Sequence, residues 1–506
     1  MLKRLFASFQ ALLLTATCNP LQAPAALAQP HRIGGMQAPQ LKRQPLAGQL
    51  QRKLDALRQK LSNRASRTSL QEAVEQSLLY NPTLAQSYSQ IQEQQWNLIA
   101  VRRRWYPQLQ ASSPGTNLLG YRGSTSKNVN NNEPGFQPGT AFTNQVQTGS
   151  TMQLSWTFFD PSRGPSINAA SESLTAQQLL FDVSARDLVL ETQLAYFALQ
   201  EQQQLIVDYE LILNSTTQQV ARTEALFNAG SASISDVEQI RTQQLQNLST
   251  LIDTYRQLVD AAARLAQAMA LPTGTLVLPQ DQLALVGRWT LAEAETLQQA
   301  ERLREEIRAS LAQASSAGWR ATALFNTYWP SFATQATGSF LNTNSADGSP
   351  GSAVTLNRQG AQWNGAVGLG FTWSIFDGGI NAAQAEESKA LARQFVDKAA
   401  VQRLSVAREV EQAYANYEAS ALALASSKEQ LRSAQTAVEA VRERFNIGYS
   451  DMTSVVQTYN QSILAASAYA RSIREFNTAV ASLYRYSARW PDGALPLVQK
   501  RVQALK

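Results

Sequence analysis

The sequence predicts a mixed membrane protein in which short β-strands of the outer-membrane type continue into long coiled-coil α-helices. Three observations carry this prediction. Apolar residues recur every seven positions over two long segments, they alternate with small polar residues in shorter segments, and the same order of elements occurs twice. Only 16% of the 506 residues are charged, which is below the roughly 25% of an ordinary soluble domain.

The N-terminus predicts an export signal. Lys3 and Arg4 precede an apolar stretch that ends near a small-x-small site at 26–28, so residues 1–28 are expected to be a signal peptide. A short membrane anchor is the alternative, although the apolar run is shorter than the roughly 20 residues of a spanning helix. Cys18, the only cysteine, is either discarded with this peptide or lipidated.

Residues 29–68 form a basic extension. The segment from Leu41 to Arg67 has a net charge of +7 and the rest of the chain sums to −1, so the charge does not indicate a nucleic-acid-binding body. A 4-3-4 spacing of leucines predicts a short amphipathic helix within it, at Leu50, Leu54, Leu57 and Leu61. It either docks on the helical barrel, on peptidoglycan or on a partner, or is a weakly ordered linker.

Two internal repeats follow, at 69–275 and 276–485, and residues 486–506 form a C-terminal segment or tail. The repeats share three motifs in the same order. These are WYP at 105–107 and YWP at 328–330, WTFFD at 156–160 and WSIFD at 373–377, and LFNAG at 226–230 and RFNIG at 444–448.

Each repeat predicts three helices. They are expected at about 70–105, 167–227 and 235–270 in the first repeat, and at about 291–328, 381–445 and 453–485 in the second. The two longest segments contain no Pro or Gly, and apolar residues such as Val410, Tyr417 and Leu424 recur every seven positions. This period predicts a left-handed supercoil. Gly230 and Gly448 are expected to end the long helices and form the tips of two helical hairpins.

Each repeat also predicts two strands, at about 108–118 and 146–159 and at about 331–341 and 365–376. One face is apolar and the other is small and uncharged, as in transmembrane strands, and a soluble β-sandwich edge is the alternative. The Gly-, Asn- and Ser-rich segments at 122–143 and 342–362 are expected to be exposed loops. An aromatic belt at the membrane interface is expected to include Trp105, Tyr106, Trp156, Tyr328, Trp329 and Trp373.

Four strands cannot close a barrel, because the smallest membrane barrels have about eight. An open edge is not stable in lipid, so the chains must oligomerise, with two giving eight strands and three giving twelve. The periodicity of the sequence does not decide between a dimer and a trimer.

The segments LFNAGSASISDVEQIRTQQLQ and RFNIGYSDMTSVVQTYNQSIL, each after a long helix, resemble the TolC family of outer-membrane efflux ducts. The resemblance covers about residues 69–485. It implies a homotrimer, a twelve-stranded outer-membrane β-barrel, and a helical barrel that extends into the periplasm. It also implies a mixed equatorial region, here at 275–289 and 491–502, and partners in a periplasmic adaptor and an inner-membrane pump.

The resemblance also implies an entrance gate and docking tips. In the family, an Asp after the first tip latches the entrance to an Arg and a Tyr near the second. Here those positions hold Asp236, Ser450 and Phe445, so that latch cannot form as in the family. The family's two acidic rings fall on Ser454 and Gln457, and Asp451 could supply a ring instead. Adaptor docking is expected at the tips, at Gly230, Ser231, Gly448 and Tyr449.

For Asp236 and Asp451 the alternative is a first-turn carboxylate that stabilises a helix N-terminus. The predicted function is a passive exit duct for efflux or type I secretion. With one His and one Cys and no catalytic or nucleotide motif in a usable context, we expect no enzyme activity, cofactor or metal site, and no nucleic-acid partner. A structural coiled-coil anchor and a diffusive porin are the alternatives.

Overall fold

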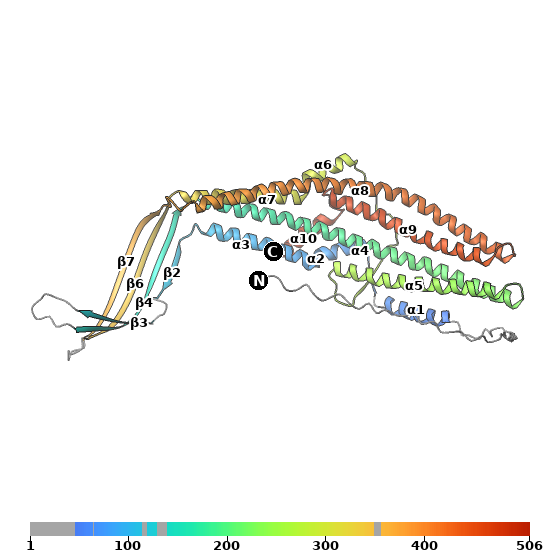
Figure 1. The fold of residues 1–506 in the computed structure, drawn as a ribbon, viewed down its shortest axis with the longest axis horizontal. Coiled ribbons are helices and arrows are strands. Elements are labelled where there is room, and N and C mark those ends of the chain that lie inside the picture. The colour runs from blue at the N-terminus through green and yellow to red at the C-terminus, as the bar shows by residue number, and fades with distance from the viewer. Residues whose placement is uncertain (1–45, 64, 114–118, 129–138, 349–355, 506) are drawn as a thin grey trace, which may run out of the picture.

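The computed structural model describes residues 46–505 apart from 64, 114–118, 129–138 and 349–355, so the expected signal peptide and Cys18 lie outside the described residues. The chain forms a long rod, with a β-sheet at one end and paired helices that run to the other end (Figure 1). Among the described residues, no helix has the length and apolar character needed to cross a membrane.

The two repeats contain the same order of elements. The first comprises α2 (Leu70–Tyr80), α3 (Pro82–Arg103), β2 (Gln108–Ser112), β3 (Leu119–Asn128), β4 (Gly139–Phe159), α4 (Arg163–Asn228) and α5 (Ile234–Ala268). The second comprises α6 (Glu293–Leu303), α7 (Glu305–Phe325), a 3-10 turn (Asn326–Tyr328), β6 (Ser331–Gly348), β7 (Leu356–Thr372), α8 (Ile380–Asn446) and α9 (Met452–Tyr486). Outside the repeated pattern lie α1 (Leu46–Ser62), β1 (Ala65–Thr68), β5 (Leu276–Pro279) and α10 (Ala494–Leu505).

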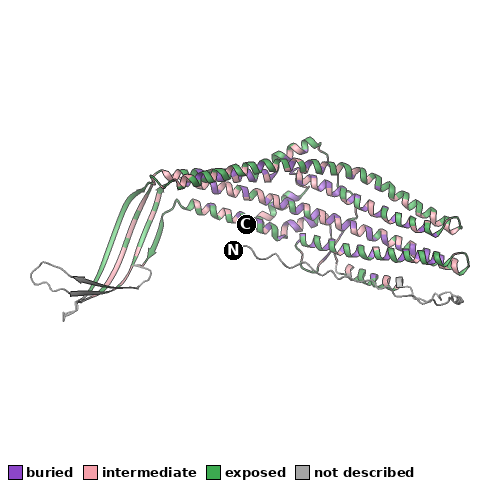
Figure 2. Cartoon of the chain, in the orientation of Figure 1, coloured by how far each residue is buried: buried purple, intermediate pink, exposed green. Residues whose placement is uncertain are grey.

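Helices α4 and α8 contain 66 and 67 residues, so each is about 100 Å long. The seven-residue pattern is confirmed on α8, where Val410, Ala413, Ser420 and Ser427 are buried and the opposite face is exposed. Figure 2 shows buried residues along the sides on which neighbouring helices meet. The seven-residue spacing therefore places one side of α8 against α9, as in a coiled coil.

The expected helices at 70–105 and 291–328 are each broken. The first breaks at Asn81, because the residue before a proline is disfavoured in a helix and the Asn81 side chain accepts a hydrogen bond from Thr83 N at 2.8 Å. The second breaks at Arg304, whose ψ is 121° without a following proline. Its guanidinium is buried between Glu306 and Glu409, which fixes the turn by tertiary contacts.

The sheet is antiparallel, in the order β2-β4-β6-β7. Strands β2 and β3 pair in succession with the same side of β4, so they are two segments of one edge strand. The expected loops at 122–143 and 342–362 were wrong in part, because β3, β4, β6 and β7 extend into them. Their polar composition does not prevent strand pairing. Strand β7 ends at Thr372, before the expected end at 376, as the chain turns toward α8.

Smaller elements surround the middle of the rod. Strands β1 and β5 pair in parallel, and α10 packs on the core that α2, α3 and α4 share. Helix α1 lies beside α5 and has Leu54 buried in a separate core that α4 and α5 share, whereas Leu57 is 43% exposed. The leucine spacing therefore corresponds to a helix that docks on the α4–α5 hairpin, where Arg58 also pairs with Glu210 at 3.0 Å.

A buried network of ion pairs connects three helices at the same level. Arg186 of α4 pairs with Glu305 of α7 at 2.9 Å, and Arg485 of α9 pairs with Glu306 of α7 at 2.6 Å. Burial alone would raise the pKa of Glu306, but the bonds and charges of Arg304 and Arg485 lower it to about 2. These pairs hold α4, α7 and α9 in register.

Asp182 of α4 lies beside this network, and within the described part of the chain it forms no ion pair. Burial, and then the Glu305 carboxylate, raise the pKa of Asp182 to about 6, although Arg186 and Arg308 act against the shift. A carboxyl group whose pKa is raised in the folded state contributes most to stability when the pH is below its pKa in the unfolded chain. This contribution is lost as the pH rises through about 6.

We therefore expect Asp182→Asn to raise the midpoint of thermal unfolding of the detergent-solubilised protein at pH 7.5 by roughly 1–3 °C. The difference should shrink toward pH 4.5, because the wild-type carboxyl is then protonated in the folded state. Glu306→Gln is the matched control and should lower the midpoint at pH 7.5, since its ionised form is stabilised. A gain for Asp182→Asn that is the same at both pH values would contradict the assignment.

Candidate functional site at the helical tips

The two helical hairpins end in the same type of turn. Gly230 and Gly448 have φ values of +75° and +81°. In the first turn Gly230 N donates to Phe227 O at 2.9 Å, and Ser231 N donates to Leu226 O at 2.8 Å. In the second turn Gly448 N and Tyr449 N bond in the same pattern to the ends of α8. Both are Schellman motifs, in which glycine adopts a left-handed conformation at low cost.

Both predicted gate carboxylates cap the returning helices. Asp236 forms a capping box at the start of α5, where its Oδ2 accepts from Ser233 N at 2.8 Å and Asp236 N donates to Ser233 Oγ at 3.1 Å. Asp451 is the N-cap of α9 and accepts from Ser454 N at 3.1 Å and from Ser454 Oγ. The Ser454 bonds lower the pKa of Asp451. In the single chain, both carboxylates therefore serve helix starts.

The remaining predicted gate residues lie at different depths. Phe445 packs partly buried against the core below the tips, whereas Ser450 is half-buried in the turn. Gln457 is exposed and lines a groove of about 510 Å³ between the first turns of α5 and α9. Ser235 and Glu238 line the α5 side of this groove. The two returning helices therefore present a shared polar surface beside the tips.

A small core joins the two hairpins just behind this groove. It contains Val220, Ile240, Met452, Val455 and Tyr459. Polar bonds reinforce it: the Ser215 and Tyr459 hydroxyls lie 2.8 Å apart, and Gln243 donates to Asn460 at 2.7 Å. The hairpins are consequently fixed to each other close to their tips.

Sequence reasoning missed one cation in this region. Arg241 of α5 pairs with Glu224 of α4 at 2.8 Å and with Glu238 at 2.9 Å. It holds the two arms of the first hairpin together about two turns from Gly230. The i+3 spacing of Glu238 and Arg241 was a visible signal, but the pairing across the hairpin required the register of α4 on α5.

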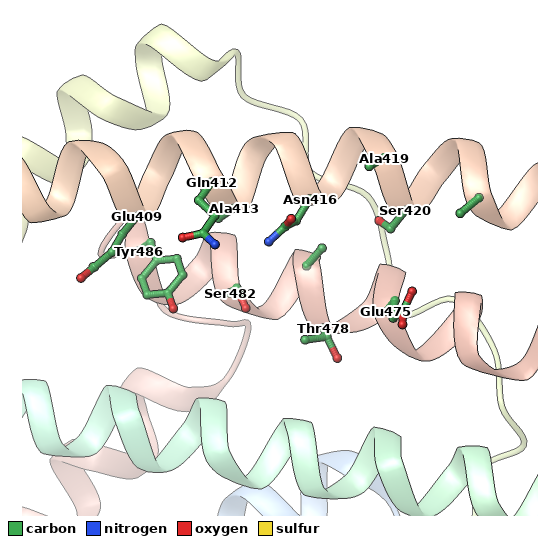
Figure 3. A pocket seen from close by; sticks show the side chains of 12 residues that line it. Glu409, Gln412, Ala413, Asn416, Ala419, Ser420, Glu475, Thr478, Ser482 and Tyr486 are labelled. Atoms are coloured by element: carbon green, nitrogen blue, oxygen red, sulfur yellow. The ribbon is translucent and has the colours of Figure 1, made fainter. Parts of the chain in front are cut away.

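A second groove lies between α8 and α9 nearer the middle of the rod (Figure 3). It has a volume of about 450 Å³, with small side chains such as Ala413 and Ser420 on its wall. Glu409 and Tyr486 lie near one end and Glu475 near the other (Figure 3). The predicted gate and docking residues lie at the tips and do not line this groove.

The predicted aromatic belt lies at the opposite end of the rod, where strands meet helices. Trp156 Nε1 donates to Trp105 O, and Trp373 Nε1 donates to Tyr328 O, each at 2.9 Å. The two repeats therefore contain the same indole-to-backbone bond. Trp329 is 65% exposed and Tyr106 is 68% exposed. The Trp105 ring additionally stacks under the Arg163 guanidinium, 4.4 Å from the ring centroid.

The chain is similar to known proteins over most of its length. A family model described as outer membrane efflux protein matches residues 73–271 and 291–489. The outer membrane protein TolC of Escherichia coli (strain K12) is 22% identical over 402 residues, which is 77% of this chain and 76% of that protein.

Two solved structures share the fold at low sequence identity. The CmeC outer membrane channel of Campylobacter jejuni superposes with a TM-score of 0.65 and 12% identity, covering 86% of this chain and 90% of that chain. The open state of the MtrE outer membrane channel of Neisseria gonorrhoeae superposes with a TM-score of 0.60 and 18% identity, covering 83% and 89%.

Gly448→Val should loosen the second tip. A Cβ at Gly448 meets open space, so the expected cost of about 1–2 kcal/mol comes from the left-handed backbone rather than from a clash. Hydrogen exchange of the Tyr449 amide, which bonds to Arg444 O at 2.8 Å, should accelerate by roughly 5- to 30-fold. Gly448→Asn is the control and should change it less, because Asn tolerates this conformation. If the Tyr449 amide exchanged at the same rate in Gly448→Val and in the wild type, the turn would not depend on a positive φ at residue 448.

Proposed function

Because this chain belongs to the outer membrane efflux protein family, we propose that it is the outer-membrane exit duct of a tripartite efflux or type I secretion system. It works as a homotrimer and passively conducts substrates that an inner-membrane pump and a periplasmic adaptor deliver. The chain is an outer-membrane protein, like its relative TolC.

The observation that carries the proposal is the open, apolar sheet. Val367 and Leu369 of β7 are each 81% exposed in the single chain. In the described part of the sheet, β7 is an outer strand with a neighbour on one side, and the β2–β3 strand lies at the opposite edge. In lipid these edges must be paired. Three copies of the four strand positions would close a twelve-stranded barrel with its apolar face outward.

The long hairpins favour a duct over a simple pore. Helices of about 100 Å place the tips far from the sheet, on the periplasmic side if the sheet spans the outer membrane (Figure 1). We assign adaptor docking to Gly230, Ser231, Gly448 and Tyr449, and Tyr449 is 84% exposed. The resting entrance would be formed by the first turns of α5 and α9, with Asp236, Phe445, Ser450, Asp451, Ser454 and Gln457.

The alternatives differ from a duct in measurable ways. A structural anchor has no need of a sheet with a small, uncharged inner face, and a diffusive porin has no need of the helical hairpins. Purified protein in planar bilayers should be trimeric and should conduct weakly at rest, with conductance increasing when the tips are perturbed by Gly448→Val. A trimer that never conducts, even in this variant, would support an anchor. High resting conductance that survives deletion of the hairpins would support a porin.

Removal of the Asp236 carboxylate should change resting conductance little. Its oxygens already bond to Ser233, and neither Phe445 nor Ser450 offers a cation at the positions the family uses. Ser233→Ala is the matched control, because it breaks the same capping box from the other side. We expect Asp236→Ala and Ser233→Ala to shift conductance equally and by less than about twofold, because each variant removes only the same helix cap and leaves the core behind the tips in place. A large increase in Asp236→Ala alone would instead show a latch to a neighbouring chain.

A further inference from the structure

One face of the sheet changes character along the strands. Near the helices it carries Leu154 and Trp156 on β4 and Leu369 and Phe371 on β7, all of them exposed. The register places these residues on one face, because Trp156 pairs with Thr334 and Thr334 pairs with Leu369. The opposite face of β7 carries Gly368 and Gly370 at the same level. The apolar face is therefore the outward face of the proposed barrel.

The apolar character of this face ends at one pair of residues. Phe340 of β6 pairs with Trp363 of β7, their ring centroids are 4.5 Å apart, and Trp363 is 76% exposed. Farther from the helices the same face carries mostly amide and hydroxyl groups among its described side chains, with Val146, Ala346 and Ala361 as apolar exceptions. These polar residues are Asn144, Thr148, Asn342, Asn344 and Gln359.

The distance between the two aromatic levels matches a membrane. Phe332 lies beside the belt at the helices, and Phe340 lies eight residues farther along β6. The section from Phe332 to Phe340 contains nine residues, and a tilted transmembrane β-strand needs about 9–11 residues. An outer-membrane barrel has aromatic residues at both interfaces of its apolar band. The Phe340–Trp363 pair thus has the position and chemistry of the second interface.

The strands nevertheless continue beyond this pair. The β6–β7 ladder runs without interruption from Leu341 opposite Gln362 to Asp347 opposite Leu356, which adds about 23 Å. On the other side of β6, the β4–β6 ladder extends as far as Phe142 opposite Gly348. Burying this section in hydrocarbon would remove the outward side-chain amides of Asn342, Asn344 and Gln359 from water, and a polar group buried without a hydrogen-bond partner costs several kcal/mol.

We propose that the apolar band ends at Phe340 and Trp363 and that the strands beyond them form a collar outside the membrane. The band contacts lipid acyl chains, and the collar contacts water and the polar headgroups of the outer leaflet. Phe340 and Trp363 anchor the barrel at that outer interface, opposite the belt at the helices. The inference rests on the proposed outer-membrane orientation. It adds the position along the strands at which contact with lipid ends.

Cysteine accessibility in cells tests this boundary. The sequence has one cysteine, Cys18, in the expected signal peptide, so the cleaved protein gives no background. Gln359→Cys lies in the collar, and Leu369→Cys is the matched control on the same strand and face, within the band. Tyr449→Cys reports the periplasmic tip. Asn344→Cys, opposite Gln359, is a second collar position in case one variant fails to assemble.

A membrane-impermeant maleimide should label the collar variants on intact cells at least about tenfold more than Leu369→Cys, because a thiol in hydrocarbon does not ionise. Leu369→Cys should react only after denaturation, and Tyr449→Cys only after the outer membrane is permeabilised. Collar variants that stay protected until denaturation, while Tyr449→Cys behaves as expected, would overturn the collar alone. Collar variants that react only together with Tyr449→Cys after permeabilisation would overturn the proposed orientation and the collar with it.

Discussion

The long helices extend about 100 Å beyond the sheet because small and apolar side chains recur at seven-residue spacing along them. On α8 the buried Ala413, Ser420 and Ser427 let α9 approach closely, and Ser427 and Ser472 bond across that contact at 2.7 Å. Polar groups within this seam pair with each other or with the helix backbone, so burial leaves them satisfied. Without this spacing the hairpins would separate, and the tips would have no defined position relative to the sheet.

The second requirement is a rigid transition from helix to strand. Both repeats meet it with a tryptophan on the strand side whose indole donates to the backbone just after the preceding helix, at Trp156 and Trp373. The flanking contacts differ, since Arg163 stacks on Trp105 in one repeat and Tyr328 donates to Asp377 in the other. The shared bond ties the strand end to the end of the preceding helix in each repeat, and the contacts around the bond differ between the two repeats.

At the tips, the same polar side chains serve local folding and the proposed entrance. Asp236 and Asp451 satisfy the free amides of α5 and α9, as helix N-termini require. A carboxylate already engaged in a cap is a poor partner for a second strong bond. In the single chain, the core around Ile240, Val455 and Tyr459 packs the two hairpins together just behind these caps.

Periodicity and motif repetition alone were sufficient to predict the long helices, the glycine tips and the apolar half of each strand, because these depend on local spacing. The break at Asn81 was also readable, since Pro82 follows it. The break at Arg304 was not, because it depends on Glu306 and on Glu409 of a distant helix. Likewise, the polar ends of β6 and β7 resembled loops in the sequence. These ends form strands because they pair with neighbouring strands in the folded protein. Backbone hydrogen bonds across a sheet do not require apolar side chains.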